Sequence, residues 1–450
     1  MINIVVIQLA RLGDIIQTIP LLDDIIEVYP EANIHLFVNE LFQECHFFLK
    51  DIRVVPVVLE NLADKNENLS SKQSVENYLI QLSAIFSSKI SLLINLNNSV
   101  ISKYITDFLD CDTKLGFGTK DSLEWSAFVT SFLPTRHLGS LNLVDIFRGF
   151  FYQNIKNRNH SLMIKTKDSI WKSEISTTKK QIALQCGARN IKRQFTFQHY
   201  IDIAKHYLQR DYQVFLLGIK SESKTANAIF NKIKHKNLID TTGKTDLKML
   251  LEIVSSCEMV YTPDTGTMHL ATFCGTPFTS LFCGPAYPFE TLAYNPAVTV
   301  FMPDREVFPC YPCKDDEVCP YDFACHSFSF SKFFTGEGNK GFKQLSVDFD
   351  KIGQVLTPID EMAVLWREFT KFYFFESSTL PHNLPILYIE GNSLLLKREL
   401  RLWDIVDIND LEVAKSNFHF LKPLIYFNKL SKDKRLIQSA LNYFNSILSK

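Results

Sequence analysis

The sequence lacks an excess of charge of either sign. Its 450 residues include 48 Lys and Arg against 49 Asp and Glu, which leaves a formal net charge of −1. Proteins that bind nucleic acid usually carry a basic excess that meets the phosphates, so this balance argues against a nucleic-acid partner. Hydrophobic residues make up 46% of the chain, which is ordinary for a folded protein, and the length predicts two or three domains.

Long apolar runs are also missing. No stretch of 18 or more apolar residues occurs, so we expect no membrane-spanning helix. The first residues, MINIVVIQLARLGD, have no basic leader, and Arg11 and Asp14 interrupt the apolar run, which argues against a signal peptide. We therefore expect a cytoplasmic protein whose membrane contact, if it has one, is peripheral and made by the aromatic stretch Phe328–Phe334. Without a secretory signal, the ten cysteines predict reduced thiols or metal ligands rather than disulfides.

The chain does contain alternating buried strands and amphipathic helices, which predict parallel α/β units. In the first half, strands are expected at Ile4–Leu9, Ile34–Val38, Val54–Leu59 and Ser91–Leu96, and helices from Asp14 and over Val75–Phe86. Pro20 should kink the first helix or start a new first turn. The polar segment Thr166–Lys180 predicts a linker. After it, strands are expected at Gln181–Gln185, Gln213–Leu217, Leu238–Asp240 and Met259–Tyr261, and helices at Phe197–Arg210, Ser221–Lys234 and Asp246–Ser255.

The stretch Tyr261–Pro285, YTPDTGTMHLATFCGTPFTSLFCGP, predicts a strand end, a tight turn, a helix from near Thr265 and a further strand. Ligands of such units bind beyond the carboxyl ends of the strands, where helix N-termini present free N–H groups. Asp264, Thr265, Gly266 and His269 all lie at that end and suit a nucleoside diphosphate. The alternative is that Asp264 or Thr265 only caps the helix and that His269 is an ordinary half-buried side chain.

Several motifs occur together in a fixed order. They are IVVIQLARLGDIIQTIPLL, CGARNIKRQF, VFLLGIKSES, and the run from DTTGKTD to the end of the Tyr261–Pro285 stretch. Together they resemble the bacterial ADP-heptose heptosyltransferases, glycosyltransferase family 9, over about residues 1–330. The resemblance implies a GT-B fold, an α/β architecture in which two Rossmann-like domains face a cleft.

The domain boundaries that follow are an acceptor-binding domain over residues 1–165, a linker over 166–180 and a donor-binding domain over 181–345. Residues 346–450 are expected to form an appended, mainly helical region that carries a hairpin of Ile386–Ile389 and Ser393–Leu396.

The resemblance also implies roles for individual residues. Asp14 is implied as the catalytic base that takes the proton of the acceptor hydroxyl, because a sugar hydroxyl is a poor nucleophile. The alternative is a helix cap, and both roles are compatible. Arg11 and Gly13 are implied as acceptor contacts. The donor site is implied to consist of Arg189, Lys192, Glu222, Asp264, Thr265, Gly266 and His269, with Lys192 facing the diphosphate and Glu222 facing the ribose.

A cysteine-rich segment follows, FPCYPCKDDEVCPYDFAC. Cys310, Cys313, Cys319 and Cys325 lie within sixteen positions, and four thiolates can close around one tetrahedral zinc or iron ion. Such an ion would be structural, since the chain shows no DxD-type motif and we expect no catalytic metal. The alternatives are free thiols, or disulfides if the protein is oxidised.

The resemblance implies an inverting glycosyltransferase that moves a heptose, or a related sugar, from an ADP-sugar to a lipopolysaccharide core acceptor at the cytoplasmic side of the inner membrane. One alternative is transfer to a protein acceptor, with residues 346–450 recognising that protein. Another is a GT-B module that binds without catalysis, although intact Asp14, Lys192 and Asp264 argue against it. A GT-B-like epimerase would lack the RLGD start and the PDTGTMHLA helix.

Overall fold

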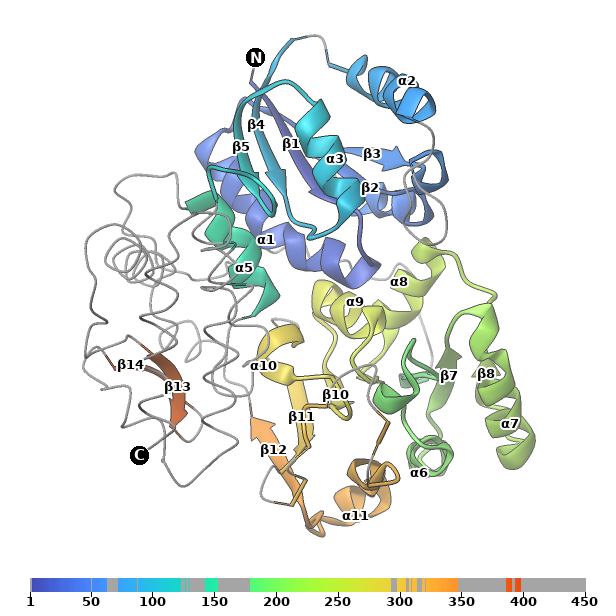
Figure 1. The fold of residues 1–450 in the computed structure, drawn as a ribbon. Coiled ribbons are helices and arrows are strands. Elements are labelled where there is room, and N and C mark those ends of the chain that lie inside the picture. The colour runs from blue at the N-terminus through green and yellow to red at the C-terminus, as the bar shows by residue number, and fades with distance from the viewer. Residues whose placement is uncertain are drawn as a thin grey trace.

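Two parallel α/β sheets lie on either side of helix α1 (Leu12–Val28) in the computed structural model of the chain (Figure 1). The structure describes residues 2–49, 51–62, 72–86, 88–122, 126, 129, 142–152, 179–292, 298–304, 307–308, 310–313, 318–319, 321–346, 386–390 and 393–397.

The first sheet has five parallel strands in the order β3-β2-β1-β4-β5. Its strands are β1 (Asn3–Gln8), β2 (Asn33–Asn39), β3 (Arg53–Val57), β4 (Ile90–Asn95) and β5 (Cys111–Gly116). Its helices, besides α1, are α2 (Lys72–Ser83), α3 (Val100–Phe108) and α5 (Leu143–Tyr152). The four predicted strands and both predicted helices are confirmed within a few residues, whereas β5, α3 and α5 were not predicted.

Helix α1 continues through Pro20 from Leu12 to Val28, so the proline does not begin a new helix. A proline removes one backbone donor, and the buried residues around it offset that loss. Ile15 and Leu22 on this helix are both fully buried. Arg148 of α5 holds the other side of α1 through a buried bidentate ion pair with Asp24, at 2.6 and 2.9 Å.

The second sheet has seven strands in the order β12-β11-β10-β9-β6-β7-β8, of which β12 alone is antiparallel. The strands are β6 (Gln181–Gln185), β7 (Gln213–Leu217), β8 (Leu238–Asp240), β9 (Met259–Tyr261), β10 (Phe278–Leu281), β11 (Val298–Pro303) and β12 (Phe342–Ser346). The helices are α6 (Phe197–Leu208), α7 (Ser223–Ile233), α8 (Leu247–Ser256), α9 (Gly266–Cys274), α10 (Pro288–Thr291) and α11 (Phe330–Thr335). Strands β6 to β9 have the predicted bounds.

The two domains share part of one core. Ile16 of α1 belongs to the buried cluster of the second domain, because α1 packs against α9 as well as against its own sheet. The rings of Phe48 and Phe273 lie 4.9 Å apart across the junction. The Glu44 carboxylate accepts a hydrogen bond of 3.0 Å from the backbone N–H of Leu247, at the start of α8. These contacts hold the carboxyl ends of the two sheets toward each other.

The aromatic stretch Phe328–Phe334 packs into the second domain, which corrects its predicted role in membrane contact. Phe328 and Phe330 are 3% and 0% exposed, and Phe333 and Phe334 pack against the same core. Helix α11 begins at Phe330 and β12 follows it, and neither element was predicted. Polar residues alternate with the aromatic ones here, so the sequence did not indicate that the rings pack together. The ring centroids of Phe328 and Phe330, for example, lie 5.0 Å apart.

The C-terminal region is described only in its hairpin. Strands β13 (Ile386–Glu390) and β14 (Ser393–Lys397) pair antiparallel, which confirms the predicted hairpin. The predicted linker before Lys179 and the predicted C-terminal helices lie outside the described residues. Among the described residues, no helix combines the length and the apolar character needed to cross a bilayer.

His199 of α6 is expected to make folding stability depend on pH. Its Nδ1 accepts from the N–H of Thr196 and its Nε2 lies 2.8 Å from the carbonyl of Phe328, as suits a neutral ring, and burial lowers its pKa to about 4. Between pH 6.5 and about 4 the unfolded chain binds a proton that the folded chain does not. The free energy of unfolding should therefore fall as pH drops through this window, by up to roughly 3 kcal/mol from this group.

Denaturant unfolding at pH 7 and pH 5 measures this slope. His199→Gln, which keeps one donor and one acceptor, should flatten it, while the control His46→Gln on an exposed residue should not. Equal slopes in the wild type and His199→Gln would contradict the assignment.

Candidate active site

Asp14 lies in the first turn of α1. Its Oδ2 accepts a hydrogen bond of 3.0 Å from the backbone N–H of Arg11, so the residue does cap the helix. Burial raises the pKa of Asp14, and the hydrogen bond and charge of Arg11 and the charge of Arg193 oppose that shift. A carboxylate with a raised pKa is a better proton acceptor, so capping and base catalysis are compatible here.

The first turn of α1 meets the first turn of α9 (Figure 1). A Cβ atom on Gly13 would lie 2.6 Å from Cδ2 of His269, so this close approach requires glycine. His269 is 5% exposed, and burial lowers its pKa to about 4, which keeps the ring neutral at pH 7. Its Nδ1 has no hydrogen-bond partner among the described residues. A buried polar atom of this kind is suited to meet a ligand.

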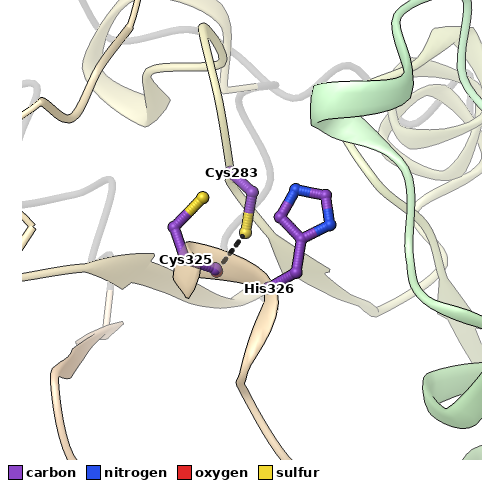
Figure 2. A group of neighbouring side chains, drawn as sticks. All are labelled: Cys283, Cys325 and His326. Atoms are coloured by element: carbon purple, nitrogen blue, oxygen red, sulfur yellow. Dashed lines mark hydrogen bonds between the residues drawn. The ribbon is translucent and has the colours of Figure 1, made fainter. Parts of the chain in front are cut away.

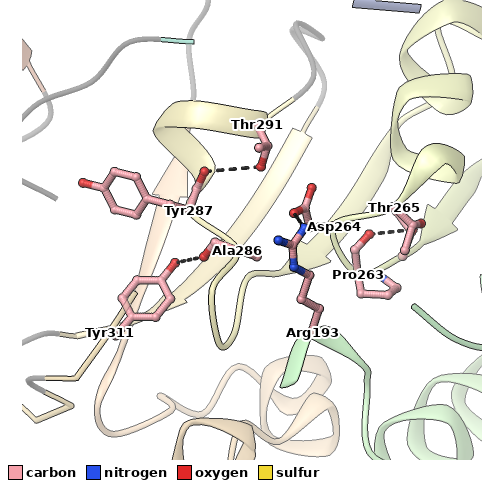
Figure 3. Close-up of polar contacts among 9 residues, drawn as sticks. Arg193, Pro263, Asp264, Thr265, Ala286, Tyr287, Thr291 and Tyr311 are labelled. Atoms are coloured by element: carbon pink, nitrogen blue, oxygen red, sulfur yellow. Dashed lines mark hydrogen bonds and ion pairs between the residues drawn. The ribbon is translucent and has the colours of Figure 1, made fainter. Parts of the chain in front are cut away.

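Asp264 lies between β9 and α9 and is 8% exposed. Its Oδ2 forms an ion pair of 2.9 Å with Nη1 of Arg193, which reaches across from the loop after β6 (Figure 3). Burial raises the pKa of Asp264; Arg193 and a hydrogen bond from Thr291 oppose the shift, and the nearby charge of Asp14 adds to it. Asp264 and Asp14 therefore belong to one charged cluster at the junction of the domains.

Thr265 is the N-cap residue of α9, and Gly266 and Thr267 are its first two helical residues. The Oγ1 atoms of Thr265 and Thr262 lie 3.0 Å apart, so the Thr265 hydroxyl stabilises the turn before α9. It makes no hydrogen bond to the N–H groups at the start of the helix. Backbone N–H groups in the first turn of a helix have no partner within that helix. The helix start thus offers donors to an anion, and it points toward Gly13 of α1.

Glu222 lies at the other end of this edge of the sheet. Its carboxylate fits between two glycines, because a Cβ on Gly187 or Gly218 would come within 2.3 or 2.5 Å of its oxygens. Its Oε2 accepts from the backbone N–H of Ile219 at 2.9 Å and from Nε2 of Gln185 at 3.0 Å. Burial raises the pKa of Glu222. The sequence did not indicate Gln185, although an amide that closes an apolar strand is a signal that could have done so.

The three remaining site residues are less tightly grouped. Arg11 and Arg189 are exposed. Lys192 is 8% exposed, and its carbonyl lies 2.9 Å from Nε2 of His326. A Cβ on Gly284 would lie 2.6 Å from the Cβ of Lys192. The two neighbouring basic side chains therefore lie in different surroundings. Arg193 pairs with Asp264, whereas Lys192 lies beside the segment that carries the cysteines.

The cysteine cluster differs from the predicted set. Among the described residues, the metal-binding atoms of Cys283, Cys325 and His326 lie within 4.8 Å of one another (Figure 2). The thiol of Cys283 donates to the carbonyl of Cys325 at 3.0 Å. Burial raises the pKa of both Cys310 and Cys313, and the charge of Cys325 adds to both shifts. Two sulfurs and an imidazole fit a zinc or iron ion, and the four-cysteine set stays a prediction beside this three-residue group.

Metal analysis of the purified protein by mass spectrometry separates the two ligand sets. We expect one zinc or iron ion per chain in the wild type. Cys325 belongs to both ligand sets, so Cys325→Ser should lose the ion, and its melting temperature should fall by several degrees. Loss in Cys283→Ser but not in Cys319→Ser would select the group with His326, and the reverse would select the four cysteines. Cys111→Ser, in the first domain, is the control. A metal-free wild type of unchanged stability would contradict both.

The fold and the site together define a class of protein. Two Rossmann-like domains, as in a GT-B glycosyltransferase, bring the first turn of α1, which carries Asp14, close to the N-terminus of α9, whose first N–H groups have no partner within that helix. The model of glycosyltransferase family 9 (heptosyltransferase) matches residues 84–319, which is more than half of the chain. The protein belongs to this family and is a glycosyltransferase.

The lipopolysaccharide core heptosyltransferase OpsX of Haemophilus influenzae is 23% identical over 304 residues, which cover 65% of this chain and 82% of that protein. Lipopolysaccharide heptosyltransferase 2 of Salmonella typhimurium is 28% identical over 93 residues, 20% of this chain and 26% of its own. Among solved structures, the family 9 glycosyltransferase of Veillonella parvula aligns with a TM-score of 0.53 at 16% identity, covering 71% of this chain and 90% of its own. The E. coli heptosyltransferase WaaC with ADP also gives 0.53, at 14% identity and 67% and 93% coverage. These structures support the GT-B fold.

Proposed function

We propose that this protein transfers a heptose, or a related sugar, from an ADP-sugar to a lipopolysaccharide core acceptor, with inversion at the anomeric carbon. The observation that carries the proposal is the close approach of the first turn of α1, which carries Asp14, to the first turn of α9. The names of the relatives support the sugar and the acceptor, since OpsX is a lipopolysaccharide core heptosyltransferase. The same proposal places the reaction at the cytoplasmic face of the inner membrane.

The donor would bind along the carboxyl ends of β6 and β9. Its diphosphate would meet the N–H groups at the start of α9, where the helix dipole favours negative charge. Glu222 would accept hydrogen bonds from the ribose hydroxyls. The anomeric carbon would then lie near Asp264 and the neutral ring of His269, on the side that faces Asp14.

The acceptor hydroxyl would attack the anomeric carbon from the side of α1. As the new C–O bond forms, the bond to the diphosphate oxygen breaks, and the proton of the hydroxyl passes to the carboxylate of Asp14. ADP leaves with the bond's electron pair, and the helix start stabilises its charge. A single displacement of this kind inverts the configuration.

Incubation with ADP-heptose and a heptose-free lipopolysaccharide core tests the proposal. We expect release of ADP and a gain in acceptor mass of one heptose. ADP release without modified lipopolysaccharide, but with a heptose-modified protein, would overturn the acceptor. No turnover with ADP-heptose, together with turnover of another nucleotide-sugar, would overturn the donor.

A further inference from the structure

Each of the two sheets ends its first strand with a buried glutamine at the point where the strand order reverses. In the first sheet the order reverses between β1 and β4, and Gln8 is the last residue of β1. In the second sheet it reverses between β6 and β9, and Gln185 is the last residue of β6. The two side chains are 0% and 7% exposed. Ligands of open α/β sheets bind at this reversal, so both amides lie under the site.

Gln185 bridges the reversal in the second sheet. Its Oε1 accepts a hydrogen bond of 2.6 Å from Oγ1 of Thr267, in the first turn of α9. Its Nε2 donates to Oε2 of Glu222 at 3.0 Å. One amide therefore links the helix start that would bind the diphosphate to the carboxylate that would bind the ribose. Only a side chain with both a donor and an acceptor can do this, because a carboxylate here would repel Glu222.

Gln8 bridges the reversal in the first sheet in the same way. Its Oε1 accepts a hydrogen bond of 2.7 Å from Nδ2 of Asn97, just after β4, and one of 3.3 Å from the N–H of Ala10. Its Nε2 donates to Oγ1 of Thr18 at 3.3 Å, and that hydroxyl donates to the carbonyl of Asp14 at 2.8 Å. This amide holds the loop between β1 and α1 and, through Thr18, the turn that carries the base.

We propose that Gln185 and Gln8 are matched positioning residues, of which Gln185 orients Glu222 toward the ribose and Gln8 orients the turn that carries Asp14. Neither amide touches the reacting atoms. Each fixes the acid of its own half-site before substrate arrives, which lowers the cost of ordering that acid on binding. The inference rests on the proposed function, because it takes an adenosine diphosphate donor as the ligand.

Two variants test the proposal, and each should change a different measured quantity. In Gln185→Met, the charged carboxylate of Glu222 loses the hydrogen bond from Gln185. Its hydrogen bonds to the ribose hydroxyls should therefore weaken. The preference for ADP over 2′-deoxy-ADP, measured by calorimetry, should fall about 10-fold or more toward unity. In Gln8→Met that preference should stay as in the wild type, while kcat for sugar transfer falls about 10-fold.

A buried glutamine on the same strand provides the matched control. Gln181 begins β6 and bonds Gln213 and Ser256 at the opposite end of the sheet, so Gln181→Met should change neither readout. If Gln185→Met does not fold, Thr267→Val removes the other partner of the amide and should lower the same preference, whereas Thr267→Ser keeps the hydroxyl and should restore it.

The outcomes separate this inference from the proposed function. A wild type that prefers ADP over 2′-deoxy-ADP, with the preference intact in Gln185→Met or Thr267→Val, overturns the positioning role alone. Equal losses of both readouts in Gln185→Met and Gln8→Met indicate general loosening and also overturn it. A wild type that binds no ADP overturns the proposed function, and the inference falls with it.

Discussion

Substitution of Asp14 by asparagine is expected to lower kcat about 10³-fold while ADP affinity changes less than 2-fold. Asparagine retains an oxygen that can accept from the N–H of Arg11, so the helix cap survives. It cannot take a proton from the acceptor hydroxyl, and loss of a general base typically costs 10²- to 10⁴-fold. Turnover of ADP-heptose and calorimetric ADP binding measure the two effects.

Alanine at the same position separates the two roles. Asp14→Ala should lose turnover to the same extent and should also lose about 1 kcal/mol of stability, because the cap is gone. Glu27→Gln, an exposed acid on the same helix, is the control and should change neither. If Asp14→Asn keeps wild-type turnover, the carboxylate is a cap and nothing more.

Burial also predicts the pH dependence of the reaction. The pKa of Asp14 is raised, and a protonated carboxyl cannot accept the proton of the acceptor. The rate should therefore fall as pH drops through this raised pKa, at a higher pH than an exposed aspartate would give. The charge of Arg193 opposes the shift, so an uncharged residue at position 193 should move this acid limb of kcat/KM to still higher pH.

Breaking the ion pair between Arg193 and Asp264 is expected to destabilise the second domain by about 3 kcal/mol. The two side chains are 20% and 5% exposed, so the pair lies mostly out of water. Removal of one partner leaves the other charge buried without its counter-ion, which typically costs 3–5 kcal/mol, and the hydrogen bond from Thr291 offsets part of that cost for Asp264. Arg193→Met keeps the length of the side chain and removes the charge. Denaturant unfolding followed by circular dichroism measures the loss.

The double variant with Asp264→Asn makes this test specific. Once Asp264 is neutral, Arg193→Met should cost much less, so the two changes together should cost less than the sum of the single changes. Arg210→Met, on an exposed arginine, is the control. Additive costs would show that the two groups do not depend on each other in the folded protein.

Local patterns allowed much of the fold to be predicted. Strands β6, β7, β8 and β9 are short apolar runs between turn residues, and their bounds follow from that pattern. Among the described strands, β5, CDTKLG, lies at the edge of its sheet and pairs with β4 alone, so it needs no continuous apolar run and gave no such signal. Helix α3 begins after the Ser99 cap, and its apolar residues fall within a single short segment that was not recognised.

From local spacing alone, site residues could be grouped only where they lie close in sequence. The turn that carries Asp264 and Gly266 is one motif, and its place at the start of α9 follows from it. Arg193 and Asp264 are 71 residues apart, and Gln185 and Thr267 are 82 apart, so no local spacing joins them. In the same way, the spacing of the four cysteines indicated one segment, whereas Cys283 precedes Cys325 by 42 residues and comes close to it through the fold.

Calorimetric titration of the purified wild-type protein with ADP, UDP and GDP tests the central claim most directly. The account predicts that ADP binds at least 10-fold more tightly than UDP or GDP, because the site along β6 and β9 is taken to hold an ADP-sugar. Tighter binding of UDP or GDP would contradict the assigned donor and leave the glycosyltransferase fold in place. No binding of any of the three would contradict the donor site itself.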